Sequence, residues 1–423
     1  MESPLADRLA RYHELVAAIH RRTNDGVHRE TPAVDFGLEG VKRMEFSGGS
    51  ILTRDTLHPA GESFGVYTAD WDAETPMPKT APSFIAAAAG TRPKNWAFLD
   101  CETTGLSGGT GTLAFLVAIG RPLKTGFFIQ QFFLSEPADE QGLLEAIELA
   151  LDGVEVLWTY NGKCFDLPVL ETRFRFWRRA VDLDRFSHVD LLVPTRILFR
   201  RRIGDCSLGN LEERILKVAR IEDLPGAEVP SVYFEYLQTG RSPRLHRVFE
   251  HNRVDVLSLA VYAAYLQRVF EAKRPERLNY PEDVLSLALY FYRKKELEQA
   301  AACLDDARTF ALGPELKAEY NRLRAYLHKR RGEYELACTH FQNLACSSPP
   351  DKVTALEELA KHHEHRRRDY RRALQFAEQA IALAERKMYF SGNEQTVHDL
   401  PALHHRRARL QRKLQALSHG PTR

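Results

Sequence analysis

The last third of the chain carries a repeat that restricts its fold more than any other feature of the sequence. Three segments begin with basic residues, continue with an acidic residue and end in alanine: Arg293–Ala300, Arg330–Ala337 and Arg366–Ala373. Their alanines lie 37 and 36 residues apart, near the period of tetratricopeptide helix pairs. Each copy predicts a helix, a charged turn and a second helix that packs through its alanine. A helical bundle with coincidental turns is the alternative.

A different pattern precedes the repeat. Between residues 95 and 160, four short apolar runs typical of buried strands follow one another across turns and one helical stretch. The expected strands are Trp96–Asp100, Leu113–Ile119, Phe127–Phe133 and Val154–Tyr160, and the expected helix is Glu140–Leu151. Helical patterns continue to about residue 270. Three meandering strands, a helix, a further strand and more helices predict a mixed α/β domain.

These patterns divide the chain into three predicted parts. Residues 1–90 are expected to hold an amphipathic helix, a short mixed segment with a few strands, and a linker. Residues 91–272 form the predicted α/β domain, and residues 281–423 form the predicted all-α repeat domain. The length of 423 residues is ample for more than one buried core.

The composition limits the cellular location and the binding partners that we expect for this protein. No run approaches eighteen apolar residues, the first residues lack the apolar core of a signal peptide, and the six cysteines form no C-x-x-C pair. We therefore expect a cytoplasmic protein with no membrane contact. The 59 basic and 57 acidic residues nearly cancel, so binding of nucleic acid has to be argued from a site and not from net charge.

Acidic residues follow two of the predicted strands. Asp100 and Glu102 stand at the end of the first strand, and residues two apart on a strand point to the same face. Asp166 follows the fourth strand, near the start of the next predicted helix. Taken singly, the pair is explained by a solvated strand end and Asp166 by the helix dipole. Together they predict carboxylates that converge at one end of the sheet.

A later predicted helix adds a histidine and a fourth carboxylate. His251 and Asp255 stand at positions i and i+4, with three residues between them, and therefore lie on one helix face. Asn252 interrupts the apolar stripe of that helix, so polar groups stand where a core face is expected. A surface His–Asp pair at the edge of the stripe is the alternative reading.

The order of these residues resembles the DEDD exonucleases of the ribonuclease H-like superfamily, and the YprB family in particular, whose members often carry C-terminal tetratricopeptide repeats. The segments that carry the resemblance are FLDCETTGLSGGTGTLAFLVAIG, YNGKCFDLPVL, HVDLLVPTRILFR, SLGNLEERIL and HNRVDVLSLA. They cover residues 90–270. The resemblance implies an α/β ribonuclease H-like domain, with a mixed sheet flanked by helices, followed by an all-α tetratricopeptide-like repeat domain.

By the same resemblance, four carboxylates would hold two Mg²⁺ or Mn²⁺ ions, which prefer hard oxygen ligands: Asp100, Glu102, Asp166 and Asp255. His251 would be the general base or would orient the attacking water. Histidine-type DEDD exonucleases usually separate this histidine from the last aspartate by four residues, whereas here His251 has the spacing typical of the tyrosine-type enzymes.

Several further residues are candidates for binding substrate. Asn161 could hydrogen-bond substrate or Asp166, and Asp190 could either support the site or cap the following helix. The basic run Arg200, Arg201 and Arg202 lies between the second and third acidic motifs and could bind a phosphate backbone. A solvated charged face is the alternative for this run.

The sequence thus predicts a metal-dependent 3′–5′ exonuclease that acts on single-stranded DNA or RNA ends, with a repeat domain that could bind a protein partner. A catalytically silent adaptor, in which the repeats alone bind the partner, is one alternative. A structure-specific endonuclease with the same metals is another.

Overall fold

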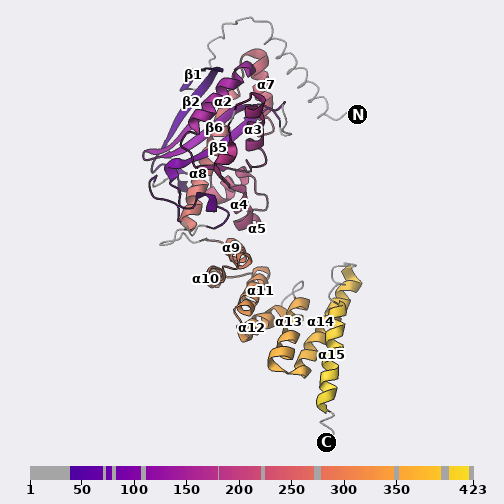
Figure 1. The fold of residues 1–423 in the computed structure, drawn as a ribbon. Helices are drawn as coiled ribbons and strands as arrows, with labels where there is room; N and C mark the ends of the chain where they lie inside the picture. Colours follow the sequence, from indigo (N-terminus) through magenta and orange to yellow (C-terminus); the bar gives the residue numbers. More distant parts are fainter. Residues whose placement is uncertain are drawn as a thin grey trace, which may run out of the picture. The chain divides into compact units, whose positions relative to one another are not determined.

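The computed structural model describes residues 39–69, 73–78, 82–105, 111–179, 181–220, 224–270, 278–346, 352–391 and 400–418. The amphipathic helix expected at the N-terminus lies outside these residues. The chain forms two compact units (Figure 1). The first contains residues 1–196 and 203–277, and the second contains residues 197–202 and 278–423.

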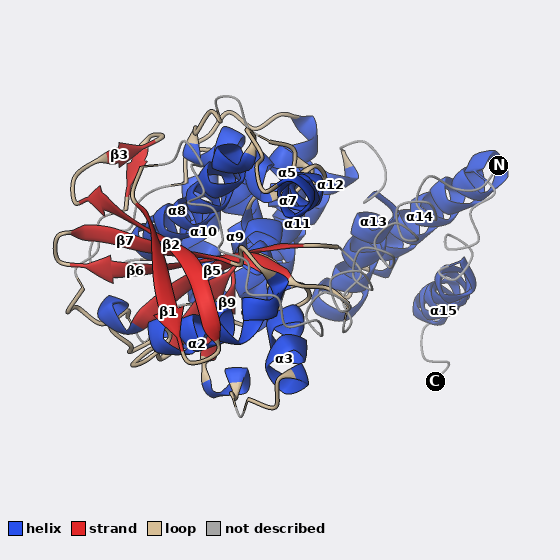
Figure 2. Cartoon of the chain, turned by 90° about the horizontal axis from the view of Figure 1, so that it is seen from above, coloured by secondary structure: helices blue, strands red, loops and turns tan. Residues whose placement is uncertain are grey.

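A seven-stranded sheet in the first unit has the order β1-β2-β7-β6-β5-β8-β9 (Figure 2). Its strands are β1 (Val41–Phe46), β2 (Gly49–Pro59), β5 (Trp96–Thr103), β6 (Ala114–Leu123), β7 (Gly126–Phe133), β8 (Val156–Thr159) and β9 (Ser187–Asp190). Strands β1, β2, β7, β6 and β5 pair antiparallel, whereas β8 and β9 continue the sheet parallel to β5. A two-stranded sheet pairs β3 (Ser63–Phe64) with β4 (Tyr67–Thr68).

The sheet includes strands from the segment that was expected to precede the α/β domain. Strand β2 pairs along β7 from Leu52↔Phe133 to Pro59↔Gly126. Strand β7, with the sequence GFFIQQFF, is apolar on both faces, and an unpaired edge of that composition would invite association with other chains. In the expected linker, Met77, Ile85 and Ala88 are buried.

Helices complete the first unit. They are η1 (Ala86–Ala88), η2 (Pro93–Asn95), η3 (Pro137–Asp139), α2 (Glu140–Ala150), α3 (Asp166–Phe176), η4 (Leu183–Arg185), α4 (Leu192–Leu198), α5 (Arg200–Ile203), α6 (Leu208–Leu211), the π-helix η5 (Glu212–Leu216), α7 (Val229–Thr239) and α8 (Leu245–Val269). The segment 197–202, which holds the end of α4 and most of α5, is assigned to the second unit.

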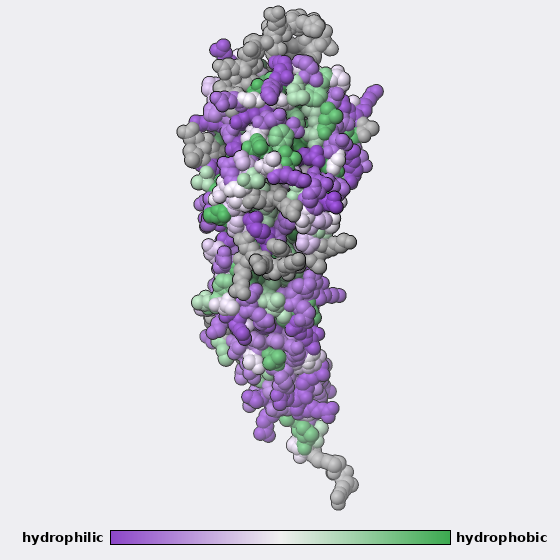
Figure 3. All heavy atoms as spheres, turned by 90° about the vertical axis from the view of Figure 1, so that its left-hand side faces the viewer, coloured by the Kyte–Doolittle hydropathy of each residue, from purple (hydrophilic) through white to green (hydrophobic). Residues whose placement is uncertain are grey.

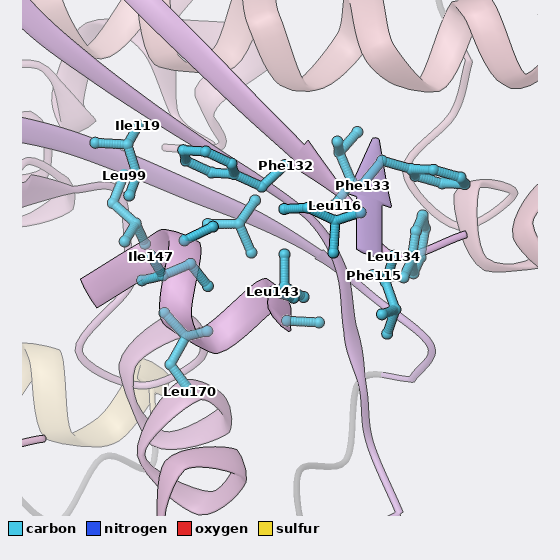
Figure 4. Packing of buried hydrophobic residues seen from close by; sticks show 14 of the residues in the cluster. Leu99, Phe115, Leu116, Ile119, Phe132, Phe133, Leu134, Leu143, Ile147 and Leu170 are labelled. Atoms are coloured by element: carbon cyan, nitrogen blue, oxygen red, sulfur yellow. The ribbon is translucent and has the colours of Figure 1, made fainter. Parts of the chain in front are cut away.

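The core lies between the sheet and its helices. Figure 4 shows Leu99 of β5 beside Ile147 of α2, and both belong to one cluster of buried residues with Leu143. On the same side, Tyr233 of α7 stacks on Phe115 with ring centroids 4.1 Å apart, and its hydroxyl donates to the Leu134 carbonyl. This packing fixes β5 inside the sheet, between β6 and β8. The end of β5 is therefore a rigid place for side chains.

The second unit is helical, as the repeat predicts. Its helices are α9 (Pro281–Lys294), α10 (Leu297–Ala307), α11 (Pro314–Arg330), α12 (Tyr334–Ala345), α13 (Lys352–His362), the π-helix η6 (His363–Arg367), α14 (Tyr370–Ser391) and α15 (Leu400–Ser418). Helices consecutive in the chain pack as neighbours, and the repeat alanines Ala300, Ala337 and Ala373 are all buried. The face of this unit seen in Figure 3 is mainly hydrophilic.

The three repeat turns share one backbone feature. The third residue of each copy has a positive φ: 67° at Lys295, 77° at Gly332 and 53° at Arg368. Left-handed backbone at the end of a helix redirects the chain, and it is strained for any residue except glycine. The copies thus match in backbone conformation as well as in sequence.

We expect Gly332→Val to destabilise the α11–α12 pair by about 1 kcal/mol or more, because a β-branched residue is strained at positive φ. Gly332→Asn should cost less, since asparagine tolerates this conformation. Hydrogen–deuterium exchange of the α11 and α12 amides measures both effects. Equal protection in the two variants would contradict the backbone argument.

Candidate active site

Two carboxylates project from the end of the interior strand β5. Asp100 and Glu102 are two residues apart on this strand and lie on one face of it, as the sequence predicts. The pairing of β5 with β6 is regular up to Glu102 and shifts between Glu102 and Thr103. The regular register therefore ends directly after the second acidic residue.

Asp166 reaches the same strand from the first residue of α3. Its Oδ1 accepts a hydrogen bond of 3.1 Å from the Cys101 backbone N–H, between the two strand carboxylates. Asp166 is only 9% exposed. The contact joins the start of α3 to the end of β5, so the three predicted carboxylates of these two elements are neighbours.

A chain of amides ties α8 to the strands. The Asn252 Nδ2 donates to Asp100 Oδ2 at 2.8 Å, and the Gln131 Nε2 of β7 donates to Asn252 Oδ1 at 3.1 Å. Asn252 and Gln131 are fully buried. Buried amides stabilise a fold only when they are paired, which explains why Asn252 interrupts the apolar stripe of α8. Gln131 was not among the predicted site residues; its signal was a glutamine inside an apolar strand.

His251 and Asp255 complete the cluster from the same helix. The His251 Nε2 lies 3.9 Å from Glu102 Oε1 and 3.7 Å from Asp255 Oδ2. The side chains of all three residues are 12–13% exposed. The structure thus brings together the five residues that the sequence placed in the catalytic group.

Burial and mutual repulsion shape the acidity of this cluster. Burial, together with the charges of Asp255, Asp166 and Glu102, raises the pKa of Asp100 well above its usual range. Burial also raises the pKa of Glu102 to about 8 and the pKa of Asp166 to about 7. Carboxylates held this close without a cation favour their protonated forms. The cluster is therefore short of positive charge.

One arginine of the chain supplies part of that charge. Arg220 donates from Nη2 to Asp255 Oδ1 and from Nη1 to His251 Nδ1, the latter at 3.1 Å. It also donates from Nε to Glu212 Oε2 at 2.5 Å, and Glu212 is 1% exposed. A guanidinium has no acceptor, so His251 Nδ1 is the acceptor in this contact. Sequence reasoning missed Arg220 and Glu212, because no local pattern links them to the acidic motifs.

The donor set fits hard divalent cations. Four carboxylates from three elements offer only oxygen ligands, and the raised pKa values of Asp100, Glu102 and Asp166 show that their shared site would favour a cation. As they stand, no three His, Cys, Asp or Glu side chains among the described residues are arranged to hold a metal ion. Asp255 is instead engaged by Arg220.

Asp190 and Asn161 meet each other one strand away. Asp190 ends β9, and its Oδ1 accepts from the backbone N–H groups of Asn161 at 2.8 Å and Leu192 at 3.0 Å. Asn161 has a φ of 63° in the turn that follows β8. Asp190 therefore fixes this turn and the first residue of α4, which is the geometry expected of a cap. Its negative charge also contributes to the raised pKa of Asp166, for which burial is the main cause.

The basic run lies in the second unit. Arg202 makes a bidentate contact with the buried Asp283 of α9, with Nε 2.9 Å from Oδ2, and stacks over the Tyr280 ring at 4.0 Å. Arg201 pairs with Glu319 of α11, and Arg200 is exposed. These contacts give Arg201 and Arg202 partners within their own unit, whereas the carboxylate cluster belongs to the first unit.

Comparison with known proteins agrees with this architecture. The family model described as the RNase H superfamily matches residues 97–267, which hold all five residues of the cluster. Over 349 residues the chain is 30% identical to the "Uncharacterized protein YprB" of Bacillus subtilis (strain 168), covering 81% of this chain and 83% of the relative. The chain belongs to the YprB family of the ribonuclease H superfamily.

This membership confirms the fold predicted from the sequence. Ribonuclease H-like proteins are generally hydrolases of nucleic acids, and their nucleases typically use divalent metals, so the YprB-family domain points to nucleic-acid processing. In the described parts of the chain, no helix combines the length and apolarity needed to cross a membrane.

The raised pKa values predict a pH-dependent stability in chelator. Between pH 5 and 8 the folded protein holds protons on Glu102 and Asp166 that the unfolded chain, with ordinary pKa values near 4, has lost. The folded state binds more protons, so stability falls as pH rises through this window. Thermal unfolding in EDTA should show the Tm decreasing from pH 6 to pH 8.

Glu102→Gln should flatten that pH profile and raise the Tm at pH 8, because it removes one of the repelling charges. Glu213→Gln provides the matched control, since Glu213 is an exposed glutamate. A profile that is equally steep in wild type and Glu102→Gln would contradict the assigned repulsion.

Proposed function

We propose that this protein is a metal-dependent nuclease that removes nucleotides from the 3′ end of single-stranded nucleic acid. The observation that supports the proposal is the convergence of Asp100 and Glu102 from β5, Asp166 from α3 and Asp255 from α8. Membership in the ribonuclease H superfamily supports the chemistry. The direction of attack and the preference for single strands come from the resemblance to DEDD exonucleases.

The four carboxylates would hold two divalent cations, Mg²⁺ or Mn²⁺. Such ions, when bound, supply the positive charge that stabilises the attacking and leaving oxygens of a phosphodiester. The remaining side chains act on the carboxylates themselves. Asn252 holds Asp100 through a 2.8 Å hydrogen bond, and the Cys101 N–H holds Asp166 at 3.1 Å. These contacts keep two ligands oriented before a cation arrives.

His251 has a narrower role than its family position implies. Because Arg220 donates to Nδ1, the proton of a neutral His251 ring resides on Nε2, the nitrogen that faces Glu102 and Asp255. A protonated Nε2 donates a hydrogen bond and cannot accept a proton. This contact therefore supports His251 as the residue that orients the attacking water, in preference to the general base.

The second unit would provide a binding surface in addition to the catalytic domain's own chemistry. Stacked helix pairs present an extended surface, which repeat proteins use for binding. We propose that this unit binds a protein partner or guides the nucleic acid, while the carboxylate cluster performs the hydrolysis.

The activity test uses the full chain with end-labelled single-stranded DNA and RNA, in Mg²⁺, Mn²⁺ or EDTA. We expect shortening from the 3′ end in either metal and none in EDTA. Asp100→Asn and Asp166→Asn should each lower the rate by about 100-fold or more, since each removes a charge that would hold the cations. Asp184→Asn, at an exposed aspartate, is the control. Intact substrates with wild type in both metals would favour the silent adaptor.

Substitution of His251 separates its two candidate roles. His251→Ala should lose most of the rate and keep its affinity for Mn²⁺, because His251 is not among the proposed ligands. His251→Gln should recover part of the rate if the ring serves as a hydrogen-bond donor, since the glutamine amide also donates. Single-turnover kinetics and Mn²⁺ calorimetry measure the two effects. Unchanged turnover in His251→Ala would remove the residue from the mechanism.

A further inference from the structure

Arg220 occupies an unusual position for a residue outside the three acidic motifs. Its guanidinium contacts Glu212, Asp255 and His251 at once, and its side chain is 14% exposed. Two of these partners belong to the proposed catalytic group. The third, Glu212, also accepts a hydrogen bond of 2.5 Å from the Ser258 hydroxyl of α8. Contacts with these three side chains thus hold Arg220 within the acidic cluster.

The local backbone brings Arg220 to this place. The π-helix η5 runs from Glu212 to Leu216, and the residue that follows it, Lys217, has a φ of 59° and turns the chain back. The Val218 N–H then donates to the Glu212 carbonyl at 2.9 Å. The returning segment sets Arg220 beside Glu212, and the two hydrogen bonds of 2.5 and 2.7 Å fix the plane of the guanidinium. The remaining donors of Arg220 are then aimed at α8.

The charges explain what such an arginine does. Four carboxylates converge, and Arg220 brings a permanent positive charge into contact with one of them, at Asp255 Oδ1. A guanidinium stays charged at every working pH. Asp255 Oδ1 therefore cannot serve Arg220 and a metal ion in the same way at the same time. A divalent cation that takes Asp255 has to displace or share this contact.

We propose that Arg220 is an internal counter-ion that competes with the divalent cations for Asp255 and that Glu212 restrains it. This inference rests on the proposed function, because it assigns Asp255 to the metal site. Without metal, Arg220 offsets part of the carboxylate repulsion and stabilises the fold. With metal, Glu212 keeps the displaced guanidinium beside the site. Arg220 is thus a positioning residue that sets how much cation the site needs.

The proposal predicts opposite effects from two neighbouring charges. Arg220→Gln removes the competitor, so Mn²⁺ should bind at least about tenfold more tightly than to wild type. Glu212→Gln removes the restraint on the guanidinium and should weaken Mn²⁺ binding, because Arg220 then interacts more strongly with Asp255. Arg220→Lys keeps the positive charge and should stay close to wild type.

The measurement is calorimetric titration of the full chain with Mn²⁺ alone, with no nucleic acid present. The double variant Arg220→Gln with Glu212→Gln avoids leaving a buried, unpaired carboxylate. It should bind more tightly than wild type and less tightly than Arg220→Gln alone. Arg214→Gln, at an exposed arginine of the same π-helix, is the matched control and should not change the affinity. Tryptophan fluorescence checks folding of the first unit, which contains all four tryptophans.

Thermal unfolding gives a second readout that does not depend on activity. In EDTA, Arg220→Gln should have a lower Tm than wild type and Arg220→Lys, and it should gain more Tm on addition of Mn²⁺. If Arg220→Gln and the double variant bind Mn²⁺ no more tightly than wild type does, the proposed role of Arg220 is wrong. The proposed metal site is retained in that case. If neither wild type nor any variant binds Mn²⁺, the proposed metal site fails, and the competition at Asp255 fails with it.

Discussion

The repulsion among four converging carboxylates is the constraint on which the account of this protein depends. Asp100, Glu102 and Asp166 all have raised pKa values, mainly because they are buried. A fold gains no stability from such a group of charges. Two hydrogen bonds hold the cluster in place: Asn252 donates to Asp100, and the Cys101 N–H donates to Asp166. Groups that are costly to the fold and yet carefully supported are typical of functional sites.

The support extends well beyond the acidic residues. Gln131 of β7 holds Asn252, and Glu212 holds Arg220, so buried polar side chains from β7, η5 and α8 converge behind the cluster. The sheet itself depends on the packing of Phe133 and Tyr233 at its core. The apolar core therefore positions the amide side chains, and the amide side chains position the carboxylates. The repeat unit is built on a different principle, a backbone turn repeated at Lys295, Gly332 and Arg368.

The sequence predicts the part of the site that depends on local residue spacing. The strand spacing of Asp100 and Glu102 and the helix spacing of His251 and Asp255 follow directly from backbone periodicity. Asn252 was visible as a break in an apolar stripe. Arg220 and Glu212 were not predictable, because their contacts with His251, Asp255 and Ser258 join residues 31 to 46 positions apart. Likewise, β2 joins the sheet through β7, and no short-range signal specifies that pairing.

The central claim is that the four carboxylates form one metal site. A crystal structure of the full chain soaked in Mn²⁺, with anomalous data, tests it most directly. We predict two manganese peaks ligated by Asp100, Glu102, Asp166 and Asp255, with Arg220 moved from Asp255 Oδ1 toward Glu212. Manganese bound elsewhere, with Asp255 still paired to Arg220 and no peak among the carboxylates, would contradict the account.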